Sequence, residues 1–377
     1  MVGTRGVPAR YGGFETCIEE VGSRLVERGH EIVVYCRSTT PQTERPATYL
    51  GMDLVHLPAL HHRALETVSH TALSVGHLLA RTVDVAFVYN AANAPFLPLL
   101  RARGLPVATH VDGLEWKRAK WSASGRRYYR AAEAAAVRWS DALIADAEGI
   151  ATYYRDEFDA PTVQIAYGTR TPGPGALARI AELGLEPRGY HLVVARFEPE
   201  NHVEMIVDGY RRSRARLPLV VVGSAPYGKA YTERIHALAD SRVRLLGGVW
   251  DSELLDGLYA GSLSYLHGHS VGGTNPSLLR AMGAGTSVLA YDVNFNREVL
   301  AGSGLFFSRA ADVTRLVELS EDDVPGALDR AELARHEVKR YEWDDVARRY
   351  EELAAELPAR RAAGGRPSGR RARGGRP

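Results

Sequence analysis

The chain has 377 residues, more than a single hydrophobic core usually holds, so we expect two domains. Hydrophobic residues make up 45% of it and charged residues 24%, which excludes a disordered, collagen-like or coiled-coil chain. The net charge is +2, and no run reaches the roughly 18 apolar residues that a spanning helix needs, so neither nucleic-acid binding nor a membrane span is expected.

Two cysteines, Cys17 and Cys36, are too few for a disulfide framework, and the first residues lack the basic and apolar regions of a secretory signal. We therefore expect a reduced, cytoplasmic protein. Residues 358–377 differ from the rest of the chain, because they contain seven arginines and no acidic residue, mostly among glycine, proline and alanine. Such a segment cannot bury enough apolar surface to fold, so we predict that it is disordered.

Short β-branched runs alternate with helical patterns, which predicts βα units around a parallel sheet. In the first half, strands are predicted at residues 31–37, 52–57, 84–89, 105–110, 141–145 and 162–167, with helices at 15–28, 62–81 and 122–139. Only Met1 and Val2 precede the first glycine, so the central strand of this sheet is expected to be nearly absent. The edges of its two neighbouring strands would then be exposed.

A turn-rich stretch at residues 167–175 interrupts the pattern, and a second series of strands follows it. These strands are predicted at residues 190–196, 217–223, 243–246, 263–267, 287–291 and 305–307. The expected organisation is an N-terminal domain (1–168), a C-terminal domain (169–342), a helix (343–357) and the disordered tail (358–377). Two doubly wound α/β domains in tandem would face a cleft, with ligands beyond the carboxyl ends of the strands.

Two glycine-rich segments are weaker candidates for phosphate binding. Residues 223–230 have the spacing of a Walker A loop, but Ala230 stands where a Mg²⁺-binding hydroxyl is required, so we interpret this segment as a turn. Residues 3–16 open a helix, and Gly12 and Gly13 would let backbone N–H groups approach an anion. A plain turn is the alternative for this second segment.

The most specific segment is residues 267–285. Gly272 and Gly273 would let the loop lie flat under an anion, Thr274 or Asn275 can cap the following helix, and a proline follows in its first turn. We predict an anion-binding helix start. The histidines at 267 and 269 have no Cys, Asp or Glu at ligand spacing, so no metal site is expected.

Several segments together resemble the bacterial rhamnosyltransferase-type branch of the retaining family 4 glycosyltransferases. The resemblance extends from about residue 3 to residue 350, and it is carried by residues 3–16, 89–95, 111–118, 196–201 and 272–279. It implies a GT-B fold, in which two Rossmann-like domains face a cleft. It also implies a donor nucleotide sugar on the C-terminal domain, an acceptor on the N-terminal domain and a last helix that crosses back to the N-terminal domain.

The resemblance also implies roles for individual residues. Arg196 matches the arginine that meets the donor diphosphate. The loop and helix start beside the donor sugar and phosphates correspond to Gly272, Gly273, Thr274, Asn275 and Ser277, and the glycine loop across the cleft corresponds to Gly12 and Gly13. The chain departs from the broader family at Asn201, where a lysine is usual, and at Gly272 and Arg280, where a pair of glutamates is usual.

Residues 115–130 combine aromatic and basic side chains in a way that suits a phosphate-bearing lipid headgroup. We assign Trp116, Lys117 and Arg118 to the acceptor and membrane side, with a solvated helix face as the alternative. Asp112, just past a predicted strand, is expected to orient the acceptor hydroxyl, and Glu115 is the second candidate. The helix predicted at residues 62–81 is expected to cover the sheet rather than to anchor the protein.

The predicted function is transfer of a hexose to a lipid-linked or cell-surface polysaccharide acceptor, with retention of the anomeric configuration. The preferred sugar is L-rhamnose, with dTDP-rhamnose as its donor. The alternatives are a transferase of the same fold that uses a UDP-sugar, and a catalytically silent sugar-nucleotide-binding or scaffold protein. No cofactor or metal is expected, since an arginine fork and helix-start N–H groups can neutralise a leaving diphosphate. The expected partners are the nucleotide sugar, the acceptor and the inner face of the cytoplasmic membrane, without nucleic acid.

Overall fold

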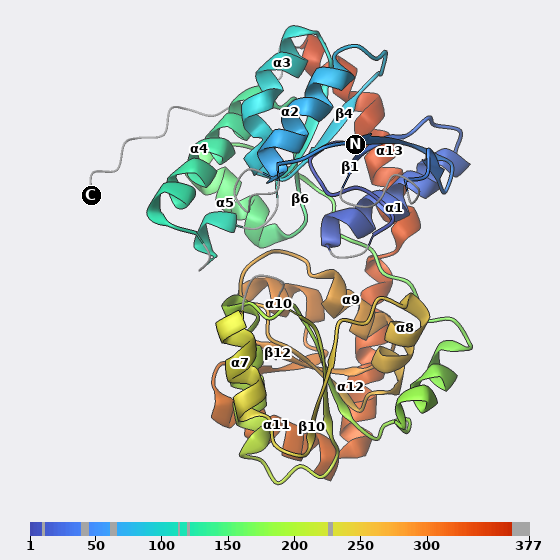
Figure 1. The fold of residues 1–377 in the computed structure, drawn as a ribbon, viewed down its shortest axis with the longest axis vertical. Helices are drawn as coiled ribbons and strands as arrows, with labels where there is room; N and C mark the ends of the chain where they lie inside the picture. The colour runs from blue at the N-terminus through green and yellow to red at the C-terminus, as the bar shows by residue number, and fades with distance from the viewer. Residues whose placement is uncertain are drawn as a thin grey trace. The chain divides into compact units, whose positions relative to one another are not determined.

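The computed structural model describes residues 1–9, 12–38, 45–60, 66–111, 114–118, 121–224 and 229–363. The chain forms two compact units: unit 1 comprises Met1–Tyr167 and Trp343–Pro377, and unit 2 comprises Gly168–Glu342. Each unit is a mostly parallel sheet covered by helices (Figure 1). Within the described residues, no helix combines the length and the apolar character that crossing a bilayer requires.

Unit 1 contains two groups of strands. The first has the order β1-β3-β2, from β1 (Val33–Arg37), β3 (Met52–Leu57) and the short β2 (Thr48–Tyr49), which was not predicted. The second has the order β4-β5-β6-β7, from β4 (Ala86–Tyr89), β5 (Val107–Val111), β6 (Ala142–Ala145) and β7 (Val163–Gln164). All neighbours are parallel except β2 and β3.

The first residues of the chain lie between β1 and β4. Val2 N donates to Phe87 O at 2.9 Å, and Tyr89 N donates to Val2 O at 2.9 Å. On the other side Tyr35 N donates to Met1 O at 3.1 Å. The expectation of two exposed strand edges was therefore wrong, because a segment too short to form a regular strand still pairs with both neighbours.

The helices of unit 1 lie on both faces of the sheet. From β3 to β7 the chain crosses the sheet in one direction, and right-handed crossovers place the connecting helices on one face (Figure 1). These elements are α2 (Glu66–Leu78), η2 (Ala91–Phe96), α3 (Leu97–Ala102), η3 (Glu115–Lys117), α4 (Ala123–Trp139) and α5 (Glu148–Phe158). Of the predicted helix 62–81, residues 62–65 lie outside the described residues.

Helices α1 (Gly13–Glu27) and α13 (Trp343–Ala362) pack against each other in unit 1. Arg24 Nε donates to Asp344 Oδ1 at 2.8 Å, and the buried thiol of Cys17 lies 3.7 Å from the Tyr350 hydroxyl. The last helix therefore contributes to the same core as the first one.

The predicted end of α13 was wrong. The helix continues past residue 357 and through Pro358 to Ala362. Near its end Arg361 donates to the backbone carbonyl of Arg101 and lies 3.4 Å from Asp141 Oδ2, which ties the last turn to unit 1. Residues 358–362 are thus helical rather than disordered, and residues 364–377 lie outside the described residues.

Unit 2 has one parallel six-stranded sheet with the order β10-β9-β8-β11-β12-β13. Its strands are β8 (His191–Val194), β9 (Leu219–Val222), β10 (Val243–Gly247), β11 (Ser264–His267), β12 (Ser287–Tyr291) and β13 (Gly304–Phe307). The strand order reverses between β8 and β11. In such sheets ligands bind at the carboxyl ends of the two strands that flank the reversal.

Helices cover both faces of this sheet around a core that includes Val193, Val221, Leu266 and Leu289. They are η4 (Ala176–Leu183), η5 (Pro199–Asn201), α6 (Val203–Arg211), α7 (Lys229–Leu238), α8 (Ser252–Gly261), α9 (Pro276–Gly283), α10 (Asn294–Leu300), α11 (Ala310–Asp322), α12 (Val324–Glu337) and η6 (Val338–Arg340). Of the Walker-like segment, residues 225–228 lie outside the described residues.

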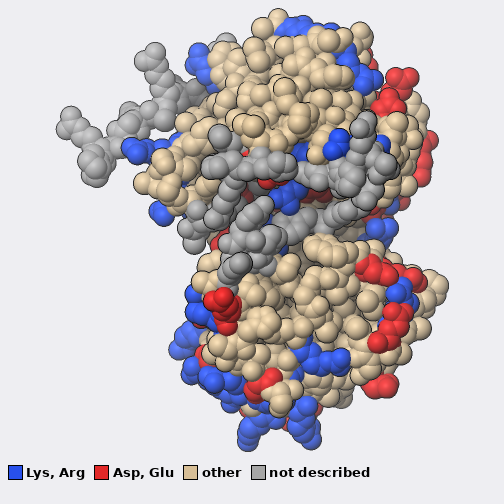
Figure 2. Space-filling view, viewed as in Figure 1, with Lys and Arg blue, Asp and Glu red and all other residues tan. Residues whose placement is uncertain are grey.

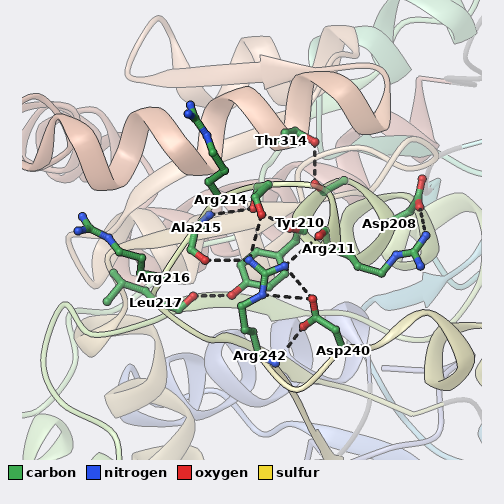
Figure 3. Close-up of polar contacts among 12 residues, drawn as sticks. Asp208, Tyr210, Arg211, Arg214, Ala215, Arg216, Leu217, Asp240, Arg242 and Thr314 are labelled. Atoms are coloured by element: carbon green, nitrogen blue, oxygen red, sulfur yellow. Dashed lines mark hydrogen bonds and ion pairs between the residues drawn. The ribbon is translucent and has the colours of Figure 1, made fainter.

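The turn between α6 and β9 is held by Arg242 (Figure 3). Its guanidinium donates to the carbonyls of Arg211, Ser213 and Ala215 at 2.9, 3.0 and 2.8 Å. It also pairs with Asp240 at 2.7 Å. Because this turn precedes β9, the network lies at the amino end of the sheet, opposite the end where ligands are expected.

Candidate active site

The first part of the candidate site is the loop after β8. Arg196 lies two residues past the end of this strand and is partly exposed. Its carbonyl accepts hydrogen bonds from Glu198 N and from Asn201 Nδ2, both at 2.8 Å. Asn201 therefore fixes the backbone of the loop that presents Arg196.

The second part is the loop after β11, which lies against the first. Ser270 N and Oγ donate to Glu200 O at 2.9 and 3.0 Å. A Cβ at Gly268 would come within 2.0 Å of Asn201 O, so only glycine allows the two loops to approach this closely. Gly272 has a φ of +142°, a conformation that other residues rarely adopt. The structure thus brings Arg196 and the predicted glycine loop to one end of the sheet.

Helix α9 begins directly after this loop. Asn275 Oδ1 accepts from Ser277 N at 2.9 Å, and Pro276 occupies the first helical position, as predicted. The first turn of α9 contains no acidic residue, and the sequence has none from His267 to Arg280. A helix start without carboxylates has a positive potential that favours an anion.

The Ser277 hydroxyl belongs to a buried polar network. It lies 2.7 Å from the Tyr259 hydroxyl and 2.5 Å from the Tyr265 hydroxyl. Thr274, another predicted donor residue, is only 3% exposed. These contacts link the first turn of α9 to α8 and β11. The Ser277 hydroxyl therefore holds the helix start in place.

His267 and His269 lie at the end of β11 with their rings stacked at 4.4 Å. Burial lowers the pKa of His267 to about 3, so this imidazole is neutral at physiological pH. Its Nδ1 lies 3.1 Å from the Tyr265 hydroxyl. Among the described residues, no group of three or more His, Cys, Asp or Glu side chains gathers as a metal site would require.

Arg280 stands where the sequence resemblance implies a glutamate. Its Nε donates to Asp256 Oδ1 at 2.6 Å, and Nη2 donates to Ser252 O at 2.7 Å. Both partners belong to α8. Arg280 therefore ties α9 to α8, a role that the sequence did not indicate.

The glycine loop of unit 1 is organised differently. Arg5 N donates to Glu15 Oε1 at 3.0 Å, and Ala9 N donates to Glu19 Oε2 at 2.7 Å. Gly12 is the N-cap of α1, Gly13 is its first residue, and no side chain caps the helix. Carboxylates of α1 itself thus take up backbone N–H groups of the described part of this loop.

Two other glycines of this loop, Gly3 and Gly6, have φ values of +104° and +94°. A Cβ would come within 2.4 Å of Tyr89 O at Gly3 and within 2.4 Å of Cys36 Sγ at Gly6. Close packing and a left-handed backbone therefore explain these two glycines without a ligand.

Asp112, the predicted residue for orienting the acceptor, lies outside the described residues. The strand before it ends at Val111, and His110 is buried between the rings of Phe14 and Tyr89, with centroids at 5.0 and 5.7 Å. Burial lowers the pKa of His110 to about 3. This histidine was not among the predicted site residues, and only its place at the end of a predicted strand could have indicated it.

The acceptor-side residues of η3 are held by neighbouring side chains. The Glu115 carboxylate is 8% exposed, lies 2.5 Å from Arg118 Nε and accepts from Trp121 Nε1 at 3.2 Å. The Trp116 ring faces the Arg130 guanidinium at 4.9 Å and Lys117 Nζ at 5.4 Å. Glu115 is therefore engaged within the protein, whereas Trp116 forms part of a basic and aromatic surface.

Helix α4 carries one buried carboxyl group that was not predicted from the sequence. Glu133 is 3% exposed, and its Oε2 accepts from the Tyr153 hydroxyl at 2.8 Å. Burial raises the pKa of Glu133 to about 7, although Arg130 and Lys117 lower it and Glu157 raises it further. An acidic residue on an alanine-rich helix gave no sign of burial in the sequence.

Comparison with known families adds a finding for each half of the chain. Residues 188–321 match the family described as glycosyl transferases group 1. The chain is a glycosyltransferase with the GT-B fold. Residues 1–170 of this transferase match a domain of unknown function, DUF1972, and no curated protein matches its sequence.

Solved structures resemble the transferase over nearly its whole length. HepE from Anabaena, solved with UDP, is 15% identical over 93% of this chain and 98% of its own, with a TM-score of 0.73. Sucrose-phosphate synthase from Thermosynechococcus elongatus is 18% identical over 93% and 96%, with a TM-score of 0.79. A glycosyltransferase from Rickettsia africae is 14% identical over 93% and 97%, with a TM-score of 0.68. At these identities the likeness concerns the fold.

Proposed function

We propose that the transferase moves a hexose from a nucleoside diphosphate sugar to a lipid-linked or cell-surface glycan acceptor, with retention of the anomeric configuration. The proposed use of a nucleoside diphosphate sugar rests on the two loops that follow β8 and β11. There Arg196 and an acid-free helix start lie at the strand-order reversal of unit 2. A guanidinium and helix-start N–H groups together favour a diphosphate.

Two donors are candidates. The sequence resemblance to rhamnosyltransferase-type enzymes supports dTDP-L-rhamnose, which we propose as the donor. A UDP-sugar is the second candidate, because HepE has been solved with UDP-glucose. The two donors differ in their pyrimidine base and in their sugar. Each has a diphosphate, which would lie beside Arg196.

In the proposed reaction the bond between C1 of the sugar and the diphosphate oxygen breaks, the acceptor oxygen bonds to C1 on the same face, and the proton of the acceptor hydroxyl passes to the leaving diphosphate. Arg196 and the backbone of residues 272–275 stabilise the negative charge on the leaving diphosphate. We assign the orientation of the acceptor hydroxyl to Asp112 rather than to Glu115, since the Glu115 carboxylate is engaged by Arg118 and Trp121. The reaction is proposed to need no metal, because these groups supply the positive charge.

The proposal places the protein in the cytoplasm at the inner face of the cell membrane, where it would take part in polysaccharide biosynthesis for the cell envelope. The supporting feature is the basic and aromatic surface around Trp116, since such side chains suit phosphate-bearing headgroups.

The direct test is incubation of the purified protein with dTDP-rhamnose, UDP-glucose or UDP-N-acetylglucosamine and a lipid-linked acceptor, with and without EDTA. The proposal expects release of dTDP and a glycosylated lipid, unchanged by EDTA. Release of UDP without release of dTDP would indicate that the donor is a UDP-sugar. Nucleotide-sugar binding without turnover under all conditions would favour a silent binding protein.

A further inference from the structure

A histidine just before α6 has a conformation that its local structure does not explain. His202 follows η5 and precedes α6, and its φ is +49°. Glycine adopts this left-handed conformation most readily, and asparagine is the usual alternative. A polar side chain at this position usually caps the following helix, but the His202 side chain does not cap α6. Contacts outside α6 must therefore explain the histidine.

The His202 side chain reaches the loop after β11. Its Nδ1 donates to Gly268 O at 2.8 Å, since a carbonyl oxygen can only accept. The imidazole ring stacks on Tyr291 at the end of β12, with centroids 4.1 Å apart and an interplanar angle of 10°. The stacked tyrosine fixes the orientation of the imidazole, and the imidazole fixes the carbonyl of Gly268.

Other polar residues of α6 make surface contacts instead. Glu204 pairs with Arg234 of α7 at 3.1 Å, and Asp208 pairs with Arg212 at 2.6 Å. Figure 2 shows basic and acidic side chains next to one another along the side of unit 2 where α7 lies. His202 differs from these residues because its partner is a backbone carbonyl of the loop after β11.

Asn296 of α10 holds the same loop from a second side. Its side chain is buried, and Nδ2 donates to His269 O at 3.0 Å and to Tyr291 O at 2.8 Å. His202 and Asn296 thus engage two successive carbonyls of the loop, and both contact Tyr291. A carbonyl oxygen that faced a diphosphate would repel it, and these two hydrogen bonds keep both oxygens on protein donors.

We propose that His202 is a positioning residue for the loop that holds the donor diphosphate. It fixes residue 268, a few residues before the backbone of residues 272–275, and so orders the loop before the donor binds. A loop that is already ordered loses less entropy on binding than a loop that must be ordered by the ligand. The role rests on the proposed donor site, and His202 itself is assigned no contact with the substrate.

The test compares two substitutions that both suit a left-handed backbone. His202→Gly removes the hydrogen-bond donor and the stacked ring. His202→Asn keeps a donor, because its amide nitrogen takes the place of Nδ1. Calorimetry with dTDP-rhamnose or UDP-glucose, whichever the wild type binds, should give a dissociation constant about tenfold higher for His202→Gly and within about threefold of the wild type for His202→Asn.

Hydrogen exchange of the whole protein without nucleotide provides a second measurement. We expect the amides of residues 268–275 to exchange about tenfold faster in His202→Gly, and nearly as in the wild type in His202→Asn. The matched control is Ala301→Gly. Ala301 has a φ of +45° just past the end of α10, so this substitution makes the same kind of backbone change in unit 2 without removing a side-chain donor. Its affinity and its exchange in the loop should match the wild type.

Wild-type affinity in His202→Gly, or equal losses in His202→Gly and His202→Asn, would overturn the inference. An equal change in Ala301→Gly would overturn it as well, because the effect would then be general. Circular dichroism checks that every variant is folded. These outcomes differ from failure of the proposed function, in which the wild type itself binds no nucleotide sugar.

Discussion

The glycine loops of the two units differ in what their backbone N–H groups face. In unit 1, Glu15 and Glu19 of the helix that follows the loop accept two of these N–H groups. In unit 2, the loop after β11 and the first turn of α9 contain no acidic residue, and Asn275 caps the helix with a neutral amide.

This difference indicates which loop can hold a diphosphate. A carboxylate that already occupies a helix start repels a second anion, whereas an acid-free helix start attracts one. Glycine content alone did not distinguish the two loops. The charge of the first helical turn does, and it supports the proposed donor site in unit 2 beside Arg196.

The largest expected effect comes from Arg196→Ala. Loss of a preorganised donor to developing charge costs about 3 kcal/mol in the transition state, so transfer should fall a hundredfold or more. Steady-state transfer assays measure this, with Arg214→Ala as a control that removes an exposed arginine from the other end of unit 2. Near-normal turnover in Arg196→Ala would remove this residue from the site.

The comparison extends to buried acids. In unit 1 burial raises the pKa of Glu133 to about 7. In unit 2 burial would raise the pKa of Glu321, but His191 and the N–H groups of Arg216 and Leu217 lower it to about 2. One buried carboxyl is therefore neutral in mild acid, and the other remains charged.

The direction in which stability changes with pH because of Glu133 follows from proton linkage. Between its unfolded pKa of about 4.3 and its folded pKa, the folded state binds more protons, so stability falls as pH rises through this window. Glu133→Gln keeps an acceptor for Tyr153 and should raise the free energy of unfolding by about 3 kcal/mol above pH 8, and by little near pH 5.

Urea unfolding at both pH values measures this effect, and Glu148→Gln is the control because Glu148 is an exposed glutamate at the start of α5. An equal effect of Glu133→Gln at the two pH values would show that the carboxyl does not titrate in this range.

A smaller effect is expected from Gly272→Ala. A positive φ costs about 1–2 kcal/mol in any residue with a Cβ, and relief of this strain would move the loop. We expect the affinity for a nucleotide sugar to fall about tenfold, as measured by calorimetry. Gly302→Ala is the control, since Gly302 has a φ of +93° and open space around it, away from the loop. An equal loss of affinity in both variants would point to general destabilisation.

The smallest effect is expected from Glu19→Gln. The hydrogen bond from Ala9 N would lose its charged acceptor, which should lower stability by about 1 kcal/mol. Donor affinity should stay within about twofold, because the account places no phosphate at this loop. Glu27→Gln, at the exposed end of the same helix, is the control. Clearly tighter donor binding in Glu19→Gln would break the comparison, since it would mean that this carboxylate repels the donor.

Periodicity was sufficient to predict the two α/β series and most strands, because buried parallel strands appear as short apolar runs between helices. It failed where pairing rather than composition decides the structure. Residues 1–5 pair with two strands although they are too few to form a regular one, and Arg361 extends a helix into a segment that its composition predicts to be disordered.

The candidate site also has parts that the sequence predicts and parts that it does not. The loop and cap of α9 follow from glycine, asparagine and proline in order, so their local structure could be predicted. The contacts of Asn201, Glu115 and Arg280 could not, because their partners are set by packing between loops and helices. The charge around each glycine loop was visible in the sequence, but which N–H groups the carboxylates reach required the structure.

The central claim is that unit 2 binds a nucleoside diphosphate sugar and that the chain transfers the sugar with retention. The most direct measurement is NMR of the product formed from α- or β-linked donor and a lipid-linked acceptor, together with quantification of the nucleotide released. The account predicts one nucleoside diphosphate released per glycosidic bond formed, the anomeric configuration of the donor in the product, and loss of both in Arg196→Ala. A product of inverted configuration, or transfer that does not require Arg196, would contradict it.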